Sequence, residues 1–378
     1  MLNLGVIGYG YRMQSVVKHL LKSGEVRIAA ITDLRTVELS AKLKEEGLTD
    51  VRFYTEAEEM LQNEKLDGVC IGTRCSTHTE FALLVEKYGV PMFLEKPVCT
   101  TESDLQRLKE ILHMNDKIVV SFPLRMTMLL QKVKEIVDSG KIGTIEHVQA
   151  YNNVVYGRGY YHKWYKDEKE TGGLFLQKAT HDLDYINYLL GDNRPVRICA
   201  MKSKQIFKGD EPEGKLCADC AKADTCTESP KNVAKNGDGY SIGPYCCFAK
   251  DTGNEDSGST IIEYESGMHV VYSQNFVVRN GAGKRGARLI GYKGTLEFDW
   301  NKSSITVYRH LENVTETYDV KVSKEGHGGG DAILAENFIG VMKGTETSRA
   351  TLQEGILSAE MCLLAKKSAE EHRFYDLI

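Results

Sequence analysis

The first part of the chain, to about residue 122, alternates between short apolar runs and longer stretches in which apolar positions recur every three to four residues. The runs have the length and residue content of buried strands, and the stretches between them have the period of helices. Strands that alternate with helices predict a parallel sheet covered on both faces. The expected strands are residues 2–7, 26–31, 51–54, 68–72, 90–94 and 118–122, and the expected helices are residues 12–22, 38–46, 56–62, 77–87 and 102–114.

The pattern changes beyond residue 125. After a helix expected at residues 129–139, apolar and polar residues alternate, as they do in strands with one buried face. An α/β domain at residues 1–124 is therefore expected to precede an α+β domain at residues 125–378 that contains a large, mostly antiparallel open sheet. The later strands are expected at residues 145–152, 260–264, 268–276, 288–292, 295–299 and 305–308, and the closing helices at residues 331–342 and 352–371.

Composition narrows the class of protein. A chain of 378 residues is long for one domain, in agreement with this division. Its net charge of -5 and its scattered Lys and Arg argue against a general nucleic-acid binder. No apolar stretch has the length of a membrane span, and the N-terminus shows no signal-peptide pattern. We expect a cytoplasmic protein whose 10 cysteines are mostly thiols or metal ligands rather than a disulfide framework.

The first strand leads into a glycine turn, Gly8-Tyr9-Gly10, before the first helix. Such a turn lets the backbone approach a pyrophosphate, and the helix N-terminus supplies oriented N–H groups. Met13 stands where the standard fingerprint has a third glycine, which would keep helix and strand further apart. Asp33 ends the second strand, where an acid binds the ribose 2′-hydroxyl. The pattern predicts a dinucleotide site that prefers NAD, although Arg35 leaves NADP open. A tight turn without a ligand is the alternative.

A second motif, Glu95-Lys96-Pro97, follows the apolar run at residues 90–94. Ligands of open α/β sheets bind at the carboxyl ends of the strands, so a lysine here would lie at the mouth of a nucleotide crevice. Pro97 fixes its own φ and moves Lys96 out of the helical region, and Glu95 could hold the ammonium by charge. Alone this would be an ordinary charge pair. Together with the glycine turn it predicts a lysine beside a cofactor.

These motifs resemble those of the Gfo/Idh/MocA family of oxidoreductases over nearly the whole chain. The resemblance rests on the glycine turn, Asp33, Thr73, His78, Glu95-Lys96-Pro97, Arg125, Gly172-Gly173-Leu174, His181-Asp182-Leu183-Asp184 and the turn from Gly291 to Leu296. It implies a Rossmann domain, homo-oligomers (dimers or tetramers) formed through the open sheet, and sugars, inositols or related polyols as substrates. The predicted cofactor-binding residues are Gly8, Tyr9, Gly10, Tyr11, Arg12, Met13, Asp33, Arg35, Thr73, His78, Glu95, Lys96 and Arg125.

The family's usual reaction moves hydride between the nicotinamide and a carbinol carbon, so a base must take the hydroxyl proton and a cation must steady the developing alkoxide. The resemblance implies that Lys96 contacts cofactor and substrate and that His181 is the general base. The family usually has an aspartate four residues before this histidine, whereas this chain has Gln177, which can orient the ring but cannot stabilise an imidazolium as a carboxylate would. Lys178 is a catalytic candidate that could replace or supplement that partner. A surface lysine is the alternative.

Two further segments contain candidate substrate contacts. His327 lies in a glycine run, which would let it cover a ligand or serve as a mobile lid, and Asp331 is expected to cap the helix that follows. The aromatic loop at residues 160–165 could offer ring faces to a sugar, although packing would explain it equally well. The predicted substrate-binding residues are Lys96, Tyr161, Gln177, His181 and His327.

Residues 201–258 are poor in strand pattern and rich in Gly, Lys, Asp and Cys, which predicts a long insertion. Cys217 and Cys220 have the spacing of tetrahedral metal ligands, with Cys226 as the third ligand and Cys246 or Cys247 as the fourth. A structural zinc ion would supply folding energy to a loop that lacks an apolar core. Free thiols, disulfides and, with less support, an iron–sulfur cluster are the alternatives.

Three functions are compatible with these motifs. The leading one is an NAD(P)-dependent dehydrogenase or reductase acting on a sugar, inositol or related polyol. The second is an NAD-dependent glycosidase, in which transient oxidation acidifies a neighbouring C–H and permits elimination, and Gln177 in place of aspartate is the reason to consider it. The third is a non-catalytic NAD-binding regulator, against which the retention of Lys96 and His181 argues.

Overall fold

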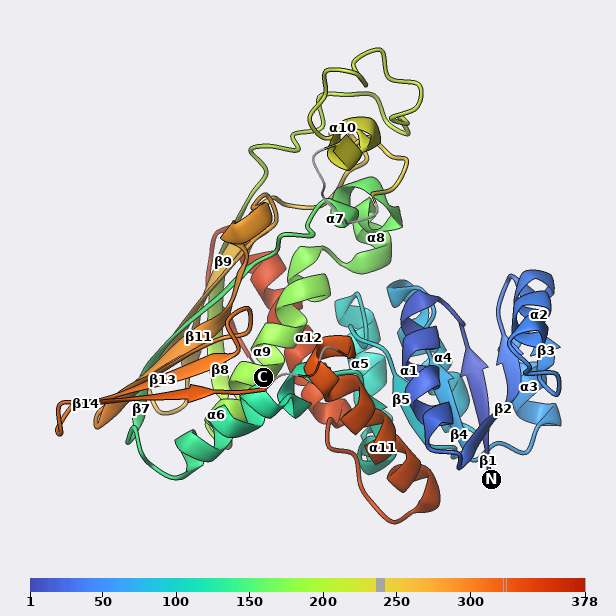
Figure 1. Ribbon diagram of the computed structural model, residues 1–378, viewed down its shortest axis with the longest axis horizontal. Helices are drawn as coiled ribbons and strands as arrows, with labels where there is room; N and C mark the ends of the chain where they lie inside the picture. Colours follow the sequence, from blue (N-terminus) through green and yellow to red (C-terminus); the bar gives the residue numbers. More distant parts are fainter. Residues whose placement is uncertain (236–241, 322, 324, 378) are drawn as a thin grey trace. The chain divides into compact units, whose positions relative to one another are not determined.

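The computed structural model describes residues 1–235, 242–321, 323 and 325–377 of the chain (Figure 1). These residues form two compact units. The first consists of residues 1–130 and 322–360, and the second of residues 131–321 and 361–378. The first unit thus extends slightly beyond residue 124, and the chain returns to it near the C-terminus. The sequence pattern did not reveal this return.

The first unit contains a sheet of six parallel strands in the order β3-β2-β1-β4-β5-β6. This is the strand order of a Rossmann sheet, so the α/β prediction is confirmed. The strands are β1 (Leu2–Ile7), β2 (Val26–Thr32), β3 (Arg52–Tyr54), β4 (Gly68–Ile71), β5 (Met92–Leu94) and β6 (Ile118–Val120). The helices are α1 (Tyr11–Lys22), α2 (Thr36–Glu45), α3 (Ala57–Asn63), α4 (His78–Glu86), α5 (Glu102–Lys109), α11 (Gly330–Lys343) and the first part of α12 (Leu352–Glu371).

Helix α11 completes the core of this unit although it is distant in sequence. The Phe338 ring lies 5.8 Å from that of Phe93 in β5, in an edge-to-face arrangement. At Gly68 in β4, an added Cβ would lie 2.4 Å from the sulfur of Met342, so only glycine lets the helix approach this strand so closely. Helix α5 is shorter than expected, because the chain changes to a 3₁₀ turn, η2 (Leu112–Lys117).

The second unit contains a nine-stranded sheet in the order β14-β13-β12-β11-β7-β10-β9-β8-β15. Every neighbouring pair is antiparallel except β10 with β7, which confirms the mostly antiparallel prediction. Strands β8, β14 and β15 were not expected. The strands are β7 (Ile145–Asn153), β8 (Pro195–Ser203), β9 (Ser257–Tyr264), β10 (His269–Asn275), β11 (Lys284–Gly291), β12 (Gly294–Asp299), β13 (Ser304–Arg309), β14 (Val314–Asp319) and β15 (Tyr375–Asp376).

Helix α9 (Thr180–Leu190) is fixed over the inner face of this sheet through one buried carboxylate. Asp182 accepts hydrogen bonds from Asn152 of β7 at 2.8 Å and from the hydroxyl of Tyr272 in β10 at 3.0 Å. It also accepts one from Arg285 of β11 at 2.8 Å. Because three central strands hold one side chain of the helix, the helical turn that precedes α9 has a defined position.

The insertion between β8 and β9 consists of loops and the short helix α10 (Pro230–Lys235). Figure 1 shows these loops beside α7 (Gly159–His162) and α8 (Glu168–Thr171), at the end of the unit away from most of the strands. Phe207 and Cys247 of the insertion pack in one buried cluster with Tyr161 and Phe276, so the insertion is anchored by apolar contacts. Across the described ranges, the structure shows no helix of the length and apolar character that crossing a membrane requires.

Candidate functional site

The glycine turn after β1 has the geometry that close backbone approach requires. Gly8 has a φ of 81°, and an added Cβ there would lie 2.7 Å from the Thr73 side chain and 2.8 Å from the Thr73 backbone nitrogen. Gly10 precedes α1 without any side-chain cap, and a Cβ there would meet only one backbone oxygen, at 3.9 Å. The N-terminus of α1 therefore has no side-chain cap and leaves space beside Gly10, which suits a pyrophosphate.

Met13 does not keep α1 away from the sheet, contrary to the expectation from the missing third glycine. It is fully buried, and the glycine needed for close packing is Gly72, directly after β4. An added Cβ at Gly72 would lie 2.7 Å from the methyl carbon of Met13 and 2.9 Å from its Cβ. The glycine that allows close packing therefore lies in the loop after β4 and not in the helix, where Met13 stands instead.

Asp33 lies at the end of β2 and is bound to the glycine turn. Its carboxylate accepts a 2.8 Å hydrogen bond from the backbone nitrogen of Tyr9 and bonds of 2.9–3.1 Å from Arg35. Burial alone would raise the pKa of Asp33, but the hydrogen bonds from Arg35 and Tyr9 hold it below its usual value. The carboxylate is therefore ionised at neutral pH, directly after the second strand of the sheet and in contact with Arg35.

His78 joins the loops that follow β4 and β5. Its Nδ1 lies 2.7 Å from the carbonyl oxygen of Pro97, and its Nε2 lies 3.3 Å from that of Thr73. Burial lowers the pKa of His78, so the neutral ring can donate through one nitrogen only, and the shorter distance points to Nδ1. His78 thus fixes Pro97 beside the half-buried Lys96, and the Lys96–Pro97 peptide bond is cis.

Arg12, in the first turn of α1, connects three predicted elements of the site. Its Nε donates to Glu95 at 2.9 Å, and its two terminal nitrogens donate to Asp331 at 2.8 and 2.7 Å. A further bond of 2.9 Å goes to the hydroxyl of Ser121. The guanidinium thus joins the glycine turn, the Glu95-Lys96-Pro97 loop and α11.

Asp331 is held by the side chains of Arg12 and His327 rather than acting as a helix cap. Gly329, not Asp331, precedes the first turn of α11, so the capping prediction was wrong. Burial alone would raise the pKa of Asp331, but hydrogen bonds from His327 and Arg12 keep it well below the usual range. The Nδ1 of His327 lies 3.0 Å from this carboxylate, and Gly330 packs so closely that a Cβ would lie 1.9 Å from the carbonyl oxygen of Pro123. These contacts therefore fix the glycine run at residues 326–330 to the first unit.

Two other predicted cofactor residues differ in exposure. Arg125 is buried, donates a 2.6 Å hydrogen bond to Glu354 at the start of α12, and lies over the Phe122 ring at 5.7 Å. This hydrogen bond holds the start of α12 within the first unit. Tyr11 is 92% exposed beside the helix N-terminus, where it is available to a ligand.

In the second unit, three predicted residues follow one another in a continuous helical run. Gln177 and Lys178 lie in a π-helical turn, η5 (Phe175–Ala179), and His181 lies in the first turn of α9. All three are buried, between 3% and 8% exposed. A π-helical turn inside a helix is frequent at functional sites. Tyr161 is fully buried, and its hydroxyl donates to the carbonyl of Glu255 at 2.7 Å, which favours the packing alternative.

The four predicted zinc ligands do not form a metal site in this structure. Within the described ranges no three or more His, Cys, Asp or Glu side chains are grouped so as to hold a metal ion. Cys217, Cys220, Cys226 and Cys246 are free, and burial, followed by the other three thiols, raises the pKa of Cys217 to about 11. The insertion is instead held by the cluster around Cys247 and by Glu228, which bonds to Arg158 at 2.8 Å.

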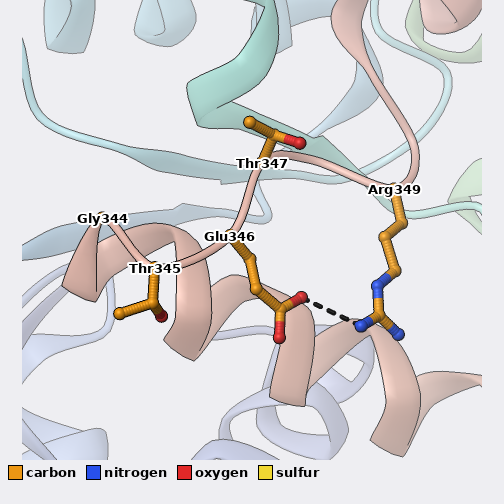
Figure 2. A pocket seen from close by; sticks show the side chains of 5 residues that line it. All are labelled: Gly344, Thr345, Glu346, Thr347 and Arg349. Carbon is orange, nitrogen blue, oxygen red and sulfur yellow. Dashed lines mark ion pairs between the residues drawn. The ribbon is translucent and has the colours of Figure 1, made fainter.

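The first unit also has an open hollow of about 610 Å³ that is separate from the glycine turn. Figure 2 shows the residues that line it. It lies where α11 ends, and an ion pair of 3.0 Å between Arg349 and Glu346 lies along it. Helix α11 has 14 residues, so the hollow lies roughly 20 Å from the N-terminal end of that helix, where Asp331 meets Arg12. The lining residues are Gly344, Thr345, Glu346, Thr347 and Arg349.

Comparison with protein families gives two adjacent matches. Residues 2–122 match the model described as an oxidoreductase family with an NAD-binding Rossmann fold. Residues 130–297 match the GFO/IDH/MocA C-terminal domain. The two ranges follow the two units, apart from the segment that returns to the first unit.

Individual relatives are similar over most of the chain. The YteT protein of Bacillus subtilis (strain 168) is 28% identical over 323 residues, which are 75% of this chain and 74% of that protein. A myo-inositol 2-dehydrogenase of Thermotoga maritima is 23% identical over 389 residues, with 98% of this chain and 97% of the relative covered. The solved structure of a levoglucosan dehydrogenase in complex with NADH and levoglucosan has the same fold, with a TM-score of 0.78, 17% identity and 99% coverage of both chains.

Proposed function

Because the chain belongs to the GFO/IDH/MocA family of NAD-binding oxidoreductases, we propose that it transfers a hydride between a nicotinamide cofactor and a carbinol carbon of a sugar, inositol or related polyol. The observation that carries the proposal is the turn at Gly8 and Gly10, open to a phosphate and followed by an ionised Asp33. The substrate class is supported by relatives named for inositol and levoglucosan dehydrogenases.

NAD is the proposed cofactor. The turn and the N-terminus of α1 would hold its pyrophosphate, and Asp33 would bind its ribose hydroxyls once Arg35 moves off the carboxylate. A 2′-phosphate would be repelled by Asp33, although Arg35 would offset part of that repulsion. When bound, the nicotinamide supplies the hydride acceptor or donor, and the protein supplies binding, orientation and proton transfer.

Lys96 and His181 are proposed to contact oxygen atoms of the substrate. Lys96 follows β5 in the loop fixed by His78, and its ammonium would steady negative charge that develops on the oxygen. His181, in the second unit, would bind a substrate hydroxyl as base or hydrogen-bond partner. Gln177 is buried in the same helical run and would orient the ring by its amide.

The proposal is tested by mixing the purified full-length chain with NAD or NADP and a panel of inositols, sugars and anhydrosugars, and following absorbance of the reduced cofactor. We expect reduction of NAD by at least one cyclic polyol, slower reduction of NADP, and loss of on the order of 10²-fold or more in kcat for Lys96→Met. Absence of any dinucleotide binding by calorimetry would overturn the proposal. Release of a leaving group from glycosides without net NADH would point to the elimination reaction instead.

A further inference from the structure

Lys178 is a buried cation whose partners are phenols rather than carboxylates. The residue is 8% exposed, and its Nζ donates a 2.6 Å hydrogen bond to the hydroxyl of Tyr156. The same ammonium lies 4.4 Å from the centre of the Tyr156 ring and 5.2 Å from that of Tyr160. In the part of the chain that the structure describes, Lys178 forms no ion pair with a carboxylate.

A buried ammonium is costly without a counter-charge, and the carboxylate whose charge acts on Tyr156, that of Asp182, already has other partners. Asp182 is fully buried and is held by Arg285, Asn152 and Tyr272. Loss of a proton from Tyr156 would therefore supply the counter-charge that Lys178 lacks. The phenolate of Tyr156 would also be stabilised by the positive charge of the Arg285 guanidinium.

The two tyrosines near Lys178 differ in their acidity. Burial alone would raise the pKa of Tyr156, but the charges of Lys178 and Arg285 and the hydrogen bond from Lys178 lower it below the usual value, against the opposing charge of Asp182. Burial raises the pKa of Tyr160, and Lys178 only partly offsets that effect. The pKa of Lys178 is raised despite burial, because Tyr156 and Tyr160 both favour its charged form. Tyr156 is thus the residue of this group that is prepared to ionise.

Tyr156 also lies where a ligand can reach it. It belongs to the loop between β7 and α7, and 37% of its surface is exposed, whereas Lys178 behind it is almost covered. The next residue, Gly157, packs so tightly that an added Cβ would lie 2.2 Å from the carbonyl oxygen of Phe276. The loop position is therefore set by backbone contact with the end of β10.

Gln177 and Lys178 precede His181 on one continuous run of helix. Lys178 lies three residues before His181 and Gln177 four residues before it, so both are neighbours on one helical run. Because Gln177 is uncharged, it supplies no counter-charge for Lys178. Ionisation of Tyr156 would place a negative oxygen directly against the Lys178 ammonium.

We propose that Tyr156 is the catalytic residue that exchanges the hydroxyl proton with the substrate, and that Lys178 is the positioning residue that keeps it ionisable. The inference rests on the proposed dehydrogenase function. In the oxidation direction the phenolate oxygen accepts the proton as the substrate O–H bond breaks, while the hydride passes from carbon to the oxidised cofactor. The substrate becomes a carbonyl compound, and Tyr156 becomes a neutral phenol that returns its proton to water.

The first test needs no substrate, so its failure is distinct from failure of the proposed function. The full-length chain is labelled with ¹³C in the tyrosine rings and titrated by NMR. One of the 19 tyrosines should ionise below the ordinary value of about 10, and its signal should be absent in Tyr156→Phe. The low value should persist in Lys178→Arg and return toward about 10 in Lys178→Met. If no tyrosine titrates early, or if the early one persists in Tyr156→Phe, the inference is overturned.

The second test is the pH dependence of kcat/KM for whichever polyol is oxidised. Tyr156→Phe should lower kcat by about 10²- to 10⁴-fold and remove the rise of activity with pH, with NADH affinity unchanged. Lys178→Met should move that rise to higher pH, and Lys178→Arg should restore it. Tyr188→Phe is the matched control, because Tyr188 has a lysine, Lys134, 5.8 Å from its ring centre but lies elsewhere on α9. If the rise survives in Tyr156→Phe and disappears in His181→Asn, the base is His181 and the inference is wrong.

Discussion

Arg12 in the first unit and Lys178 in the second are both cations, but different groups balance their charges. Arg12 has carboxylates on two sides, Glu95 and Asp331, and the bidentate contact to Asp331 has the planar geometry that arginine favours. The Lys178 ammonium instead contacts the phenols of Tyr156 and Tyr160. A carboxylate is ionised throughout the neutral range, so Arg12 forms a permanent strut. The phenol of Tyr156 can instead lose and regain a proton, so Lys178, which is bonded to it, can take part in proton transfer.

The Arg12 strut should contribute strongly to stability. Arg12→Gln leaves the Asp331 carboxylate, whose side chain is 1% exposed, without its bidentate partner. We expect the free energy of unfolding to fall by about 3 kcal/mol, at the low end for a broken buried pair because Arg12 is partly exposed. Chemical denaturation measures the change. Lys22→Gln is the control, since its ion pair with Glu325 is exposed on both sides and should contribute less than about 1 kcal/mol.

The same pair predicts a pH dependence with a defined sign. The pKa of Asp331 is lowered in the folded state, so the pair stabilises the protein above the ordinary aspartate value of about 4 and loses its effect as pH falls through the lower folded-state value. The stability gap between wild type and Arg12→Gln should therefore be full at neutral pH and shrink in acid. A gap that stays constant into acid would contradict this account.

At the scale of elements, helices α1 and α9 both begin with an irregular feature that could not be predicted from the sequence. Helix α1 lacks the third fingerprint glycine yet packs tightly, because Gly72 in the loop after β4 leaves room for Met13. Helix α9 is preceded by the π-helical turn that contains Gln177 and Lys178. In both cases the exact placement of side chains depends on a neighbour that lies outside the motif itself.

A double-mutant cycle tests the close packing between Met13 of α1 and Gly72 after β4. Gly72→Ala should destabilise the protein by about 1–3 kcal/mol, because the new methyl group overlaps Met13. Met13→Gly should also destabilise it, through the cavity and the helical glycine. In the double variant the methyl group enters the vacated space, so the loss should be smaller than the sum by at least about 0.5 kcal/mol. Strict additivity in denaturation would show that the two residues do not share this space. Gly281→Ala, with nothing within 4 Å, is the control.

At the scale of the whole molecule, the first unit is built from both ends of the sequence. Residues 322–360 supply α11, the Asp331 partner of Arg12, and the Glu354 partner of Arg125. The backbone nitrogen of Val120, at the end of β6, also bonds to the carbonyl of Ala350 at 2.7 Å. The Rossmann sheet is therefore incomplete as a stable body without the returning segment.

This dependence is testable with fragments. Residues 1–130 alone should lack cooperative thermal unfolding, because Phe93 and Gly68 lose the helix that covers them. Residues 1–130 joined by a flexible linker to residues 322–360 should unfold cooperatively, as followed by circular dichroism. The joined fragment with Phe338→Asp is the matched control and should behave like the short one. Cooperative unfolding of residues 1–130 alone would contradict the prediction.

Much of the fold could be predicted from local pattern, because strand–helix alternation and the glycine turn are encoded by adjacent residues. The position of Asp33 beside the turn follows from the same unit. The partner of Arg12 could not be found in this way, because Asp331 lies 319 positions after Arg12 and its sequence context predicted a helix cap. Tyr156 was also missed. Its significance depends on Lys178 and Arg285, which come from a helical turn and a strand elsewhere in the second unit.

The return of residues 322–360 has a consequence for protein synthesis. The ribosome releases β1 to β6 early, but the helix that covers β4 and β5 emerges only after the whole middle of the chain has been made. The face of the first sheet that α11 covers therefore stays exposed while residues 131–329 are being made. Chaperone binding to the emerging chain is therefore expected to matter more here than for a protein whose N-terminal domain closes first.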